Sequence, residues 1–535
     1  MLIPPDSLYS QVRREMSEAA SWSPSPDTFL RLIARTPPLS QNYNMIRVPS
    51  ILVVACLLIQ LASAKPPNIV LFLADDLGFG DLGSYGNPII QTPHLDTLAK
   101  DGVRLTDCHS GGTVCSPSRS SLITGRTPYR VGFYTIAGAE GCHLREQEVT
   151  LPNLLKEKGY DTCFVGKWHM GKITSEDAGP KAHGYDHWFA TEHNAFDDPE
   201  APGKFLRNGE PVGKLQGSYC DLIVEEAVNW MKNRPDPEKP FLLVVCSHEP
   251  HTPIKPPAEY SAMYDNIRTE MLESTIGYGQ VTRPRKRDIS ENMKYYYGTV
   301  TQLDDAFGRL MDSIDEQGKR EESLVVFTSD NGPETPVTFE ESHDQWEDPI
   351  RDRCFGSPGP WRGMKRYAYE GGHRVPGIVR WPGKIEAGTL STELVNGTDW
   401  MPTVCAAVGV EIPEHVTIDG VDALAALQGK PVAREIPACW MFPVGYDYRY
   451  LASMSMRDGD HTLIGFFSPK LGDQGNSAWV KSASLESFAL YDLSIDPAQR
   501  NDLKAHRPEE FERLKKLMVS TWKNIQAEAP DWTKQ

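Results

Sequence analysis

The stretch N-I-V-L-F-L-A at Asn68–Ala74 decides the fold class, because a continuous apolar run of this kind is typical of a strand buried on both faces of a sheet. Two further runs have the same texture, F-L-L-V-V-C at Phe241–Cys246 and L-V-V-F-T at 324–328. Amphipathic helical patterns lie between them, for example at 151–158 and 222–232. Alternating strands and helices predict an α/β fold with a mixed, largely parallel sheet sandwiched by helices.

The length of 535 residues predicts two or three domains. After residue 429 the pattern changes to shorter strand-like runs at 450–467 and 488–493, followed by an amphipathic helix at 508–527. We therefore expect a large domain at 65–429 and a smaller C-terminal α+β domain at 430–535.

The N-terminal region has the pattern of an export signal. An apolar run at 51–61, too short to cross a bilayer as a helix, follows Met45 and precedes Ala-Ser-Ala at 62–64. This predicts a cleaved signal peptide at 45–64 and no transmembrane anchor afterwards. Residues 1–44 are interpreted as a non-translated or disordered extension, and the alternative is an uncleaved signal anchor. The leader does not distinguish the periplasm, the external medium and the lysosome as destinations.

The composition excludes some partners. A formal net charge of −17 argues against nucleic acid, because phosphate binding needs a basic footprint. The apolar content of 40% and the mean hydropathy of −0.42 suit a globular chain. Of ten cysteines, only Cys56 lies in the predicted signal peptide, and the other nine show no C-x-x-C pair or zinc-ligand spacing. Disulfides among them are compatible with export, but the sequence does not give a pairing.

Oxygen-rich side chains follow two of the predicted strands. Asp75 and Asp76 come directly after the first strand, and Asp330-Asn331-Gly332 follows the run at 324–328. Each pair alone could be a turn or a helix cap. Ligands bind at the carboxyl ends of strands in open α/β sheets, so the two pairs together predict a four-ligand site for a hard cation such as Ca²⁺ or Mg²⁺.

Cys115-Ser-Pro-Ser-Arg119 has the pattern of a helix start. Pro117 fits a first helical turn and Gly125 fits the position just past the helix end. Cys115 should therefore lie at a helix N-terminus, which favours an anion. Arg119 is a cation in the first turn, where the helix dipole disfavours it, so it should have an anionic partner.

Further polar residues complete a candidate site. Lys167 and His169 lie two apart, so in an extended segment their side chains point to the same side, where Lys can hold an anionic oxygen and His can move a proton. His251 lies in the loop after Phe241–Cys246, where neighbouring prolines stiffen the backbone; His248 in the same loop could equally be structural. Lys365 precedes Glu370-Gly-Gly, whose glycines indicate a close backbone approach.

These segments together resemble the sulfatase family, and the likeness extends from residue 65 to about residue 530. Cys115–Gly125 (CSPSRSSLITG) fits the family signature C-x-P-x-R followed by T-G, and 159–169 (GYDTCFVGKWH) fits its second signature. The remaining matches are H-x-P at 251–253, TSDNG at 328–332, K-x₄-EGG at 365–372 and LYDLSIDP at 490–497.

The resemblance implies an alkaline phosphatase-like fold and a sulfuric ester hydrolase. A maturation enzyme reads C-x-P-x-R in the unfolded chain, so Cys115 should become formylglycine, whose aldehyde hydrates to a geminal diol. The resemblance further implies that Ca²⁺ is ligated by this diol and by Asp75, Asp76, Asp330 and Asn331.

The resemblance also implies roles for the other residues. One diol oxygen, acidified by the metal and Arg119, attacks sulfur, while Lys167 and Lys365 neutralise the sulfuryl oxygens. His251 protonates the departing alcohol, and His169 then deprotonates the second hydroxyl so that the covalent sulfate hemiester releases sulfate.

Three functions remain open at this point. Hydrolysis of a sulfated carbohydrate or aryl sulfate is the leading one, because the CSPSR form most resembles arylsulfatase and N-acetylgalactosamine-6-sulfatase members. The alternatives are a formylglycine-dependent phosphate or phosphonate monoester hydrolase and an inactive sulfated-glycan-binding protein. Arg362, Tyr367, Tyr369 and His373 are interpreted as either a substrate subsite or packing residues, and Asn396-Gly-Thr is a glycosylation sequon.

Overall fold

The computed structural model describes residues 65–194, 198–268, 271, 290–334, 353–442, 452–472 and 474–534. The predicted signal peptide at 45–64 and the stretch 1–44 lie outside these ranges. Among the described helices, none combines the length and the apolarity that a membrane crossing requires.

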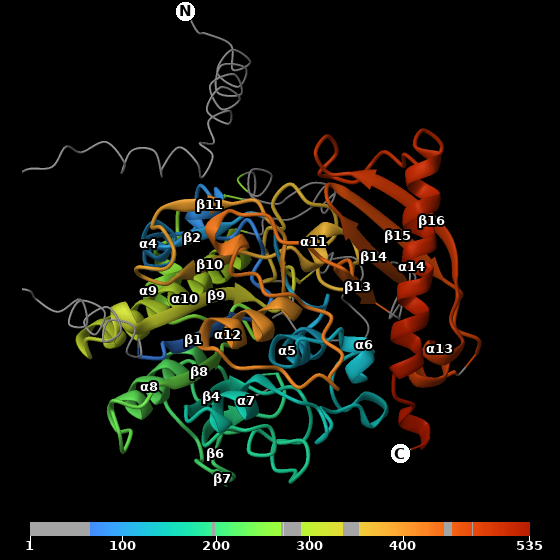
Figure 1. Cartoon of the computed structure of the whole chain (residues 1–535). Helices are drawn as coiled ribbons and strands as arrows, with labels where there is room; N and C mark the ends of the chain where they lie inside the picture. The colour runs from blue at the N-terminus through green and yellow to red at the C-terminus, as the bar shows by residue number, and fades with distance from the viewer. Residues whose placement is uncertain are drawn as a thin grey trace, which may run out of the picture. The chain divides into compact units, whose positions relative to one another are not determined.

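A large mixed sheet forms the centre of the molecule (Figure 1). Within the described ranges it has ten strands in the order β11-β2-β10-β9-β1-β8-β4-β5-β6-β7. Strand β1 (Asn68–Ala74) lies between β8 (Phe241–Cys246) and β9 (Ser323–Ser329), and β4 (Asp161–Lys167) follows β8, all in parallel. The three apolar runs are therefore adjacent central strands, as the sequence predicts. The outer strands are β2 (Val103–Leu105), β5 (His187–Thr191), β6 (Leu206–Arg207), β7 (Glu210–Pro211), β10 (Gly377–Arg380) and β11 (Thr389–Ser391).

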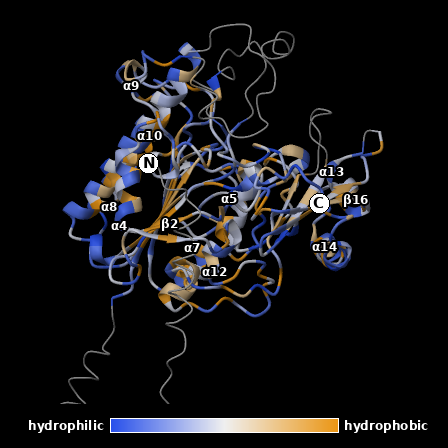
Figure 2. Cartoon of the chain, turned by 90° about the horizontal axis from the view of Figure 1, so that it is seen from above, coloured by the Kyte–Doolittle hydropathy of each residue, from blue (hydrophilic) through white to orange (hydrophobic). Residues whose placement is uncertain are grey.

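Helices cover both faces of this sheet. Alternate side chains of β1 point to opposite faces: Val70 and Phe72 join one apolar core, whereas Ile69 and Leu71 join another. Figure 2 shows the apolar strands between two helical layers. The first layer contains α4 (Pro93–Asp101), α8 (Tyr219–Lys232) and α10 (Ser290–Glu316), and the second contains α5 (Cys115–Thr124), α7 (Leu151–Glu157) and α12 (Trp400–Val408).

The longest helix, α10, follows from its sequence pattern. Its buried apolar side chains recur every three or four residues, which places them on one face of a helix. They include Met293, Tyr297, Val300, Leu303, Phe307, Leu310 and Ile314. Each such side chain contributes about 1.5–3 kcal/mol when it leaves water, so this face holds α10 on the sheet.

A smaller antiparallel sheet follows. Its strands in the described ranges are β13 (Cys439–Phe442), β14 (Ser453–Asp458), β15 (His461–Phe467) and β16 (Leu485–Asp492), accompanied by α13 (Asn476–Ser482) and α14 (Pro508–Glu528). Leu514, Met518, Trp522 and Ile525 form the buried stripe of α14. Figure 1 shows α14 lying along this sheet, so the region has the α+β character that the sequence predicts.

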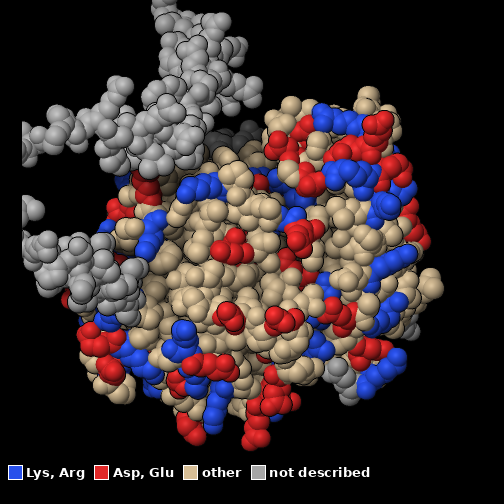
Figure 3. Space-filling view, viewed as in Figure 1, with Lys and Arg blue, Asp and Glu red and all other residues tan. Residues whose placement is uncertain are grey.

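The remaining elements are short. They are β3 (Cys108–His109), β12 (Val395–Asn396), α6 (Pro128–Val131), α9 (Ala258–Ala262), α11 (Glu370–His373), and 3₁₀ turns at Gly83–Tyr85, Ala139–Gly141, Arg320–Glu322, Gly397–Asp399, Ala426–Gln428 and Trp532–Lys534. All nine cysteines within the described ranges are buried. On the face drawn in Figure 3, Lys and Arg side chains are interspersed with Asp and Glu side chains.

Candidate functional site

The structure brings the predicted site residues together at one edge of the large sheet. Because β1, β4, β8 and β9 are parallel, their carboxyl ends lie along the same edge. The residues at or just beyond these strand ends are Asp75, Asp76, Lys167, His169, His251, Asp330 and Asn331. Helix α5 contributes Cys115 and Arg119, and the segment before α11 contributes Lys365.

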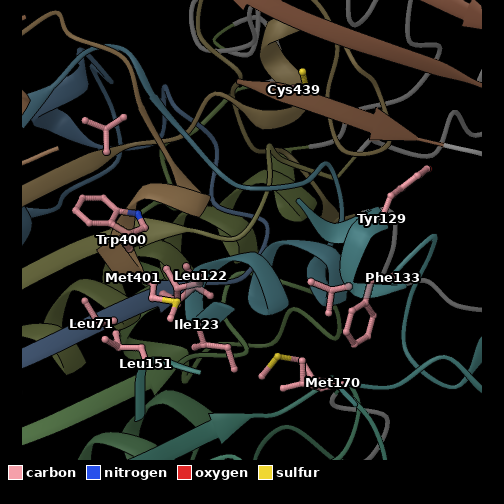
Figure 4. Packing of buried hydrophobic residues seen from close by; sticks show 14 of the residues in the cluster. Leu71, Leu122, Ile123, Tyr129, Phe133, Leu151, Met170, Trp400, Met401 and Cys439 are labelled. Atoms are coloured by element: carbon pink, nitrogen blue, oxygen red, sulfur yellow. The ribbon is translucent and has the colours of Figure 1, made fainter. Parts of the chain in front are cut away.

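Helix α5 places Cys115 at its first residue. The helix ends at Thr124, and Gly125 follows in the left-handed conformation with φ 66°, as its sequence predicts. Leu122 and Ile123 pack among Leu71, Leu151 and Met401, which come from β1, α7 and α12 (Figure 4). All ten residues of the helix are buried, so its position relative to β1 is fixed by packing.

The Cys115 thiol is a weak nucleophile in this environment. Its Sγ lies 3.6 Å from Oδ1 of Asp75 and donates toward that carboxylate. Burial, together with the negative charge of Asp75, raises the pKa of the Cys115 thiol to about 12. The thiol is therefore protonated at neutral pH, which argues against a cysteine thiolate as the attacking group.

Arg119, the fifth residue of α5, has the anionic partner that the sequence predicts for a cation near a helix N-terminus. Its Nε and Nη2 donate to Oδ2 of Asp330 at 3.1 and 2.8 Å, and Nη2 lies 3.3 Å from Oδ2 of Asp75. The Nη1 group donates to the carbonyl of Lys167 at 2.7 Å. The fully buried guanidinium thus joins three strand ends.

Two lysines balance the paired aspartates at the end of β1. Lys167 Nζ contacts Oδ2 of Asp75, and Lys365 Nζ lies 2.7 Å from Oδ1 of Asp76. Although burial raises the pKa of Asp75, the nearby cations Lys167 and Arg119 hold that pKa well below its usual range. The three buried carboxylates are thus matched by three buried cations.

Two histidines border this charged group in neutral form. His251 Nδ1 donates to the carbonyl of Thr252 at 2.7 Å, and its Nε2 lies 3.7 Å from Oδ2 of Asp76. Burial, reinforced by the positive charge of Lys365, lowers the pKa of His251 to about 4. Burial likewise lowers the pKa of His169 well below its usual value, and the Nδ1 atom of His169 has no partner among the described residues. Both imidazoles can therefore accept a proton near neutral pH.

The oxygen ligands fit a hard divalent cation. Asn331 donates from Nδ2 to Oδ1 of Asp76 at 2.6 Å and to the carbonyl of Gly332 at 2.8 Å. Its buried Oδ1 accepts no hydrogen bond within the part of the chain that the structure describes, which leaves a lone pair free for a cation. Ligand atoms of Asp75, Asp76, Cys115 and His251 lie within 4.8 Å of one another. Carboxylate and amide oxygens are the ligands that Ca²⁺ prefers.

Backbone strain and close approach are concentrated here. Asp76, His169 and Arg366 adopt positive φ angles of 66°, 52° and 76°, which cost free energy in residues other than glycine. A Cβ atom on Gly332 would lie only 1.9 Å from the carbonyl oxygen of Gly371. A Cβ atom on Gly371 would in turn lie 2.2 Å from the carbonyl oxygen of Gly363, so both the D-N-G and the E-G-G segments need glycine.

Glu334 is a site residue that sequence reasoning missed. Its half-buried carboxylate pairs with Arg366, whose Nη2 lies 2.9 Å away, and it lies 3.5 Å from Nζ of Lys365. Burial raises the pKa of Glu334, but Arg366 and Lys365 outweigh this and hold it low. Its only signal in the sequence is its position two residues after D-N-G.

Several residues with two open interpretations make packing contacts in the structure. His248 is buried, and its Nε2 lies 2.9 Å from Oγ1 of Thr191, which favours the structural role. Arg362 lies over the ring of Tyr369 at 3.9 Å, and His373 is fully buried. The sequence also has a run of basic residues that could contact an anionic substrate or be solvated, namely Arg283, Arg285, Lys286 and Arg287, and it lies outside the described residues.

A pocket adjoins His251. It is lined by residues of four segments, among them Ser218, Tyr219, Lys255 and Gln302.

Comparison with known proteins gives a consistent result. A family model described as Sulfatase matches residues 67–410, and one described as N-sulphoglucosamine sulphohydrolase, C-terminal, matches residues 361–460. Arylsulfatase A of Homo sapiens is 32% identical over 496 residues, covering 86% of this chain and 88% of the relative. N-acetylgalactosamine-6-sulfatase of Rattus norvegicus is 31% identical over 405 residues, covering 71% and 69%.

Solved structures share the fold. The protein BT4656, solved in complex with its substrate D-glucosamine-2-N,6-O-disulfate, superposes with a TM-score of 0.64 at 22% identity. The match covers 87% of this chain and 99% of that chain.

Proposed function

The chain belongs to the sulfatase family and is a sulfuric ester hydrolase with the alkaline phosphatase-like fold. We propose that it releases sulfate from a sulfated carbohydrate and that its nucleophile derives from Cys115. The observation that carries the proposal is the position of Cys115: it is the first residue of α5, with its Sγ 3.6 Å from Asp75 and beside three balanced ion pairs. A thiol held neutral is unsuited to attack, whereas a formylglycine at that position, once hydrated, supplies an oxygen nucleophile and a second hydroxyl.

A bound Ca²⁺ would be held by oxygen atoms of Asp75, Asp76, Asp330 and Asn331 and would supply Lewis-acid stabilisation of anionic oxygens. The free lone pair on Asn331 Oδ1 supports this assignment. The chain's own cations have a related role: Lys167 and Lys365 bind the anionic oxygens of the sulfate ester, and Arg119 keeps the side chain of residue 115 in an electropositive environment.

The two histidines move protons. His251 is proposed to pass a proton from Lys365 to the departing alcohol: its Nδ1 proton is held by the Thr252 carbonyl, so its Nε2 is free to accept the proton that the alcohol then takes. His169 is proposed as the base that restores residue 115, since its unpartnered Nδ1 is neutral and buried.

Charge favours a sulfate ester over a phosphate ester. Three carboxylates and three cations cancel, so a divalent cation leaves the site with two positive charges. A sulfate monoester with one negative charge and an ionised nucleophile balance this charge, whereas a phosphate monoester near neutral pH brings close to two negative charges. All predicted catalytic positions are occupied by the expected residue types, which argues against an inactive glycan-binding protein.

A carbohydrate substrate is the finer part of the proposal. The relatives named N-acetylgalactosamine-6-sulfatase, and the solved protein whose substrate is a sulfated glucosamine, support it. The leader pattern at 45–64 supports export to a compartment where such glycans occur.

Sulfate release tests the proposal directly. The chain is produced together with a formylglycine-generating maturation enzyme and assayed against defined sulfated oligosaccharides, aryl sulfates and their phosphate analogues. Cys115→Ala should abolish turnover, while Cys405→Ala, which alters another buried helical cysteine remote from the sheet edge, should retain it. Preferential hydrolysis of the phosphate analogues would contradict the sulfatase assignment, and turnover of aryl sulfates alone would contradict the carbohydrate assignment.

A further inference from the structure

A second buried group of charged residues lies where the C-terminal sheet meets the rest of the chain. Arg457, on β14, reaches two carboxylates: its Nη2 lies 3.1 Å from Oδ2 of Asp107, and its Nη1 lies 3.1 Å from Oε2 of Glu370. Arg374 contacts the same two carboxylates at 2.5 and 3.0 Å. We call Asp107, Glu370, Arg374 and Arg457 the buried ion cluster. Its two cations balance its two anions, and all four residues are buried.

A histidine pair completes this cluster. His109 Nε2 lies 2.7 Å from Oδ1 of Asp107, and its Nδ1 lies 2.9 Å from Nδ1 of His373. Because Nε2 must carry the proton to donate to a carboxylate, Nδ1 of neutral His109 accepts from His373. Asp107, His109 and Glu370 have the donor types of a metal site, but their charges are already compensated by the two arginines. The cluster is therefore interpreted as a structural connection.

Trp440, on β13, connects the histidine pair to the chain in front of Cys115. Its ring stacks on His373 with centroids 4.0 Å apart and planes inclined by 6°. Its Nε1 donates to the carbonyl of Ser110 at 2.7 Å, while the Ser110 amide donates to the carbonyl of His373 at 2.8 Å. Figure 1 shows β13 and β14 on the side of α11.

Hydrogen bonds lead from this connection into the candidate site. The segment 110–114 runs from Ser110 to the N-cap residue of α5, directly before Cys115. Within this segment, the Thr113 carbonyl accepts a hydrogen bond of 2.9 Å from the amide of Arg366. On the other side, the residues of α11 hold the segment that carries Lys365. The amide of Gly371 donates to the carbonyl of Arg362 at 2.7 Å. The segments before Cys115 and around Lys365 are thus joined to each other and to the C-terminal sheet.

From these contacts we propose that Trp440 and Arg457 are positioning residues for the hydrolytic reaction. They hold the segment 110–114 and the segment 361–369 together, and so set the position of residue 115 relative to Lys365. Neither side chain contacts a candidate catalytic group; each acts through His373, Ser110 or Glu370. The inference rests on the proposed function for its catalytic consequence, but the contacts do not depend on it.

A matched pair of tryptophan variants tests the proposal. Trp440→Phe keeps an aromatic ring against His373 and removes the hydrogen bond to Ser110. Trp479→Phe removes an equivalent bond of 2.9 Å from a buried indole to the carbonyl of Ser468, entirely within the C-terminal region. We expect Trp440→Phe to lower kcat about tenfold with KM changed by less than about twofold, because misplacement of reacting groups acts on the chemical step. Trp479→Phe should change kcat by less than about twofold.

Amide hydrogen exchange supplies a readout that does not need turnover. Peptides spanning 110–114 and 361–369 should exchange faster in Trp440→Phe than in the parent, and at the parent rate in Trp479→Phe. Equal effects of the two variants on kcat and on exchange would overturn the proposal. If Trp440→Phe fails to fold, Arg457→Lys takes its place, and Arg513→Lys, at an exposed position of the same region, is the control. We then expect Arg457→Lys to behave as described for Trp440→Phe and Arg513→Lys to behave as described for Trp479→Phe. A parent protein that releases no sulfate would instead contradict the proposed function, while the exchange data would still decide the positioning role.

Discussion

Replacing Arg119 with methionine tests the charge balance of the site. Methionine keeps a long apolar stem but removes two hydrogen bonds to Asp330, one to the Lys167 carbonyl and the ion pair with Asp75. Removal of one partner from a buried ion pair costs about 3–5 kcal/mol. Burial and the charge of Asp75 already raise the pKa of Asp330 to about 7, so protonation of Asp330 can relieve part of this cost. We therefore expect a loss near the lower limit, about 3 kcal/mol.

Urea unfolding at pH 7 in the absence of added metal measures this loss. Arg320→Met is the matched control, because Arg320 forms ion pairs with Asp101 and Asp315 at the surface, where such pairs contribute about 0–1 kcal/mol. The stability of the Arg119→Met variant should also fall more steeply than that of the parent as pH rises through 7, since Asp330 is then protonated in the folded state and ionised in the unfolded state. A free energy of unfolding within about 1 kcal/mol of the parent, similar to the control, would refute the reasoning about a charge-balanced buried site.

Four further predictions concern the site and its surroundings. His251→Ala should slow hydrolysis of an alkyl sulfate about 10²-fold or more and hydrolysis of an aryl sulfate much less, because an alkyl alcohol is a poor leaving group unless it is protonated. Equal losses for the two substrates in steady-state kinetics would exclude proton transfer by His251. Calcium at 100 times its Kd should raise the free energy of unfolding, measured by calorimetry, by about 2.7 kcal/mol. Asn331→Leu should abolish this increase, and an unchanged increase would contradict the assignment of Asn331 as a calcium ligand. Burial raises the pKa of Glu370, but the charges of Arg457 and Arg374 outweigh this effect and hold the pKa at about 2. The stabilising contribution of Glu370 is therefore present above about pH 4.5 and is lost as pH falls toward 2. Glu370→Gln should flatten the acid limb of the stability profile, and an unchanged limb would count against the ion cluster. Asn396 is 2% exposed, and its side chain forms hydrogen bonds with Thr398 and the Gly397 amide. Glycopeptide mass spectrometry of folded protein from a glycosylating host should therefore find Asn396 unmodified. A glycan on Asn396 would contradict the structure at that turn.

The local sequence was sufficient to predict the central strands and the start of the catalytic helix. The run Asn68–Ala74 is uniformly apolar because β1 is buried on both faces, and Pro117 and Gly125 mark the two ends of α5. The dipole argument also predicted that Arg119 needs an anion, and Asp330 is that partner. Such inferences succeed because each depends on a few neighbouring residues and on general rules of strand burial and helix electrostatics.

Contacts between distant segments were beyond the reach of the sequence. Glu334 pairs with Arg366 only because the chain after β9 returns beside the segment of Lys365. The ion pairs of Arg457 with Asp107 join residues 350 positions apart. The sequon at Asn396 has the correct motif, yet its side chain caps a buried turn. In these cases the outcome is decided by tertiary packing, of which a single sequence carries no local signal.

Mass spectrometry of the peptide that contains residue 115 tests the central claim most directly. In catalytically active protein made with a maturation enzyme, the account predicts formylglycine in place of cysteine, and a formylglycine fraction that rises in proportion to specific activity across preparations. Active protein that carries an unmodified Cys115 thiol throughout would contradict it.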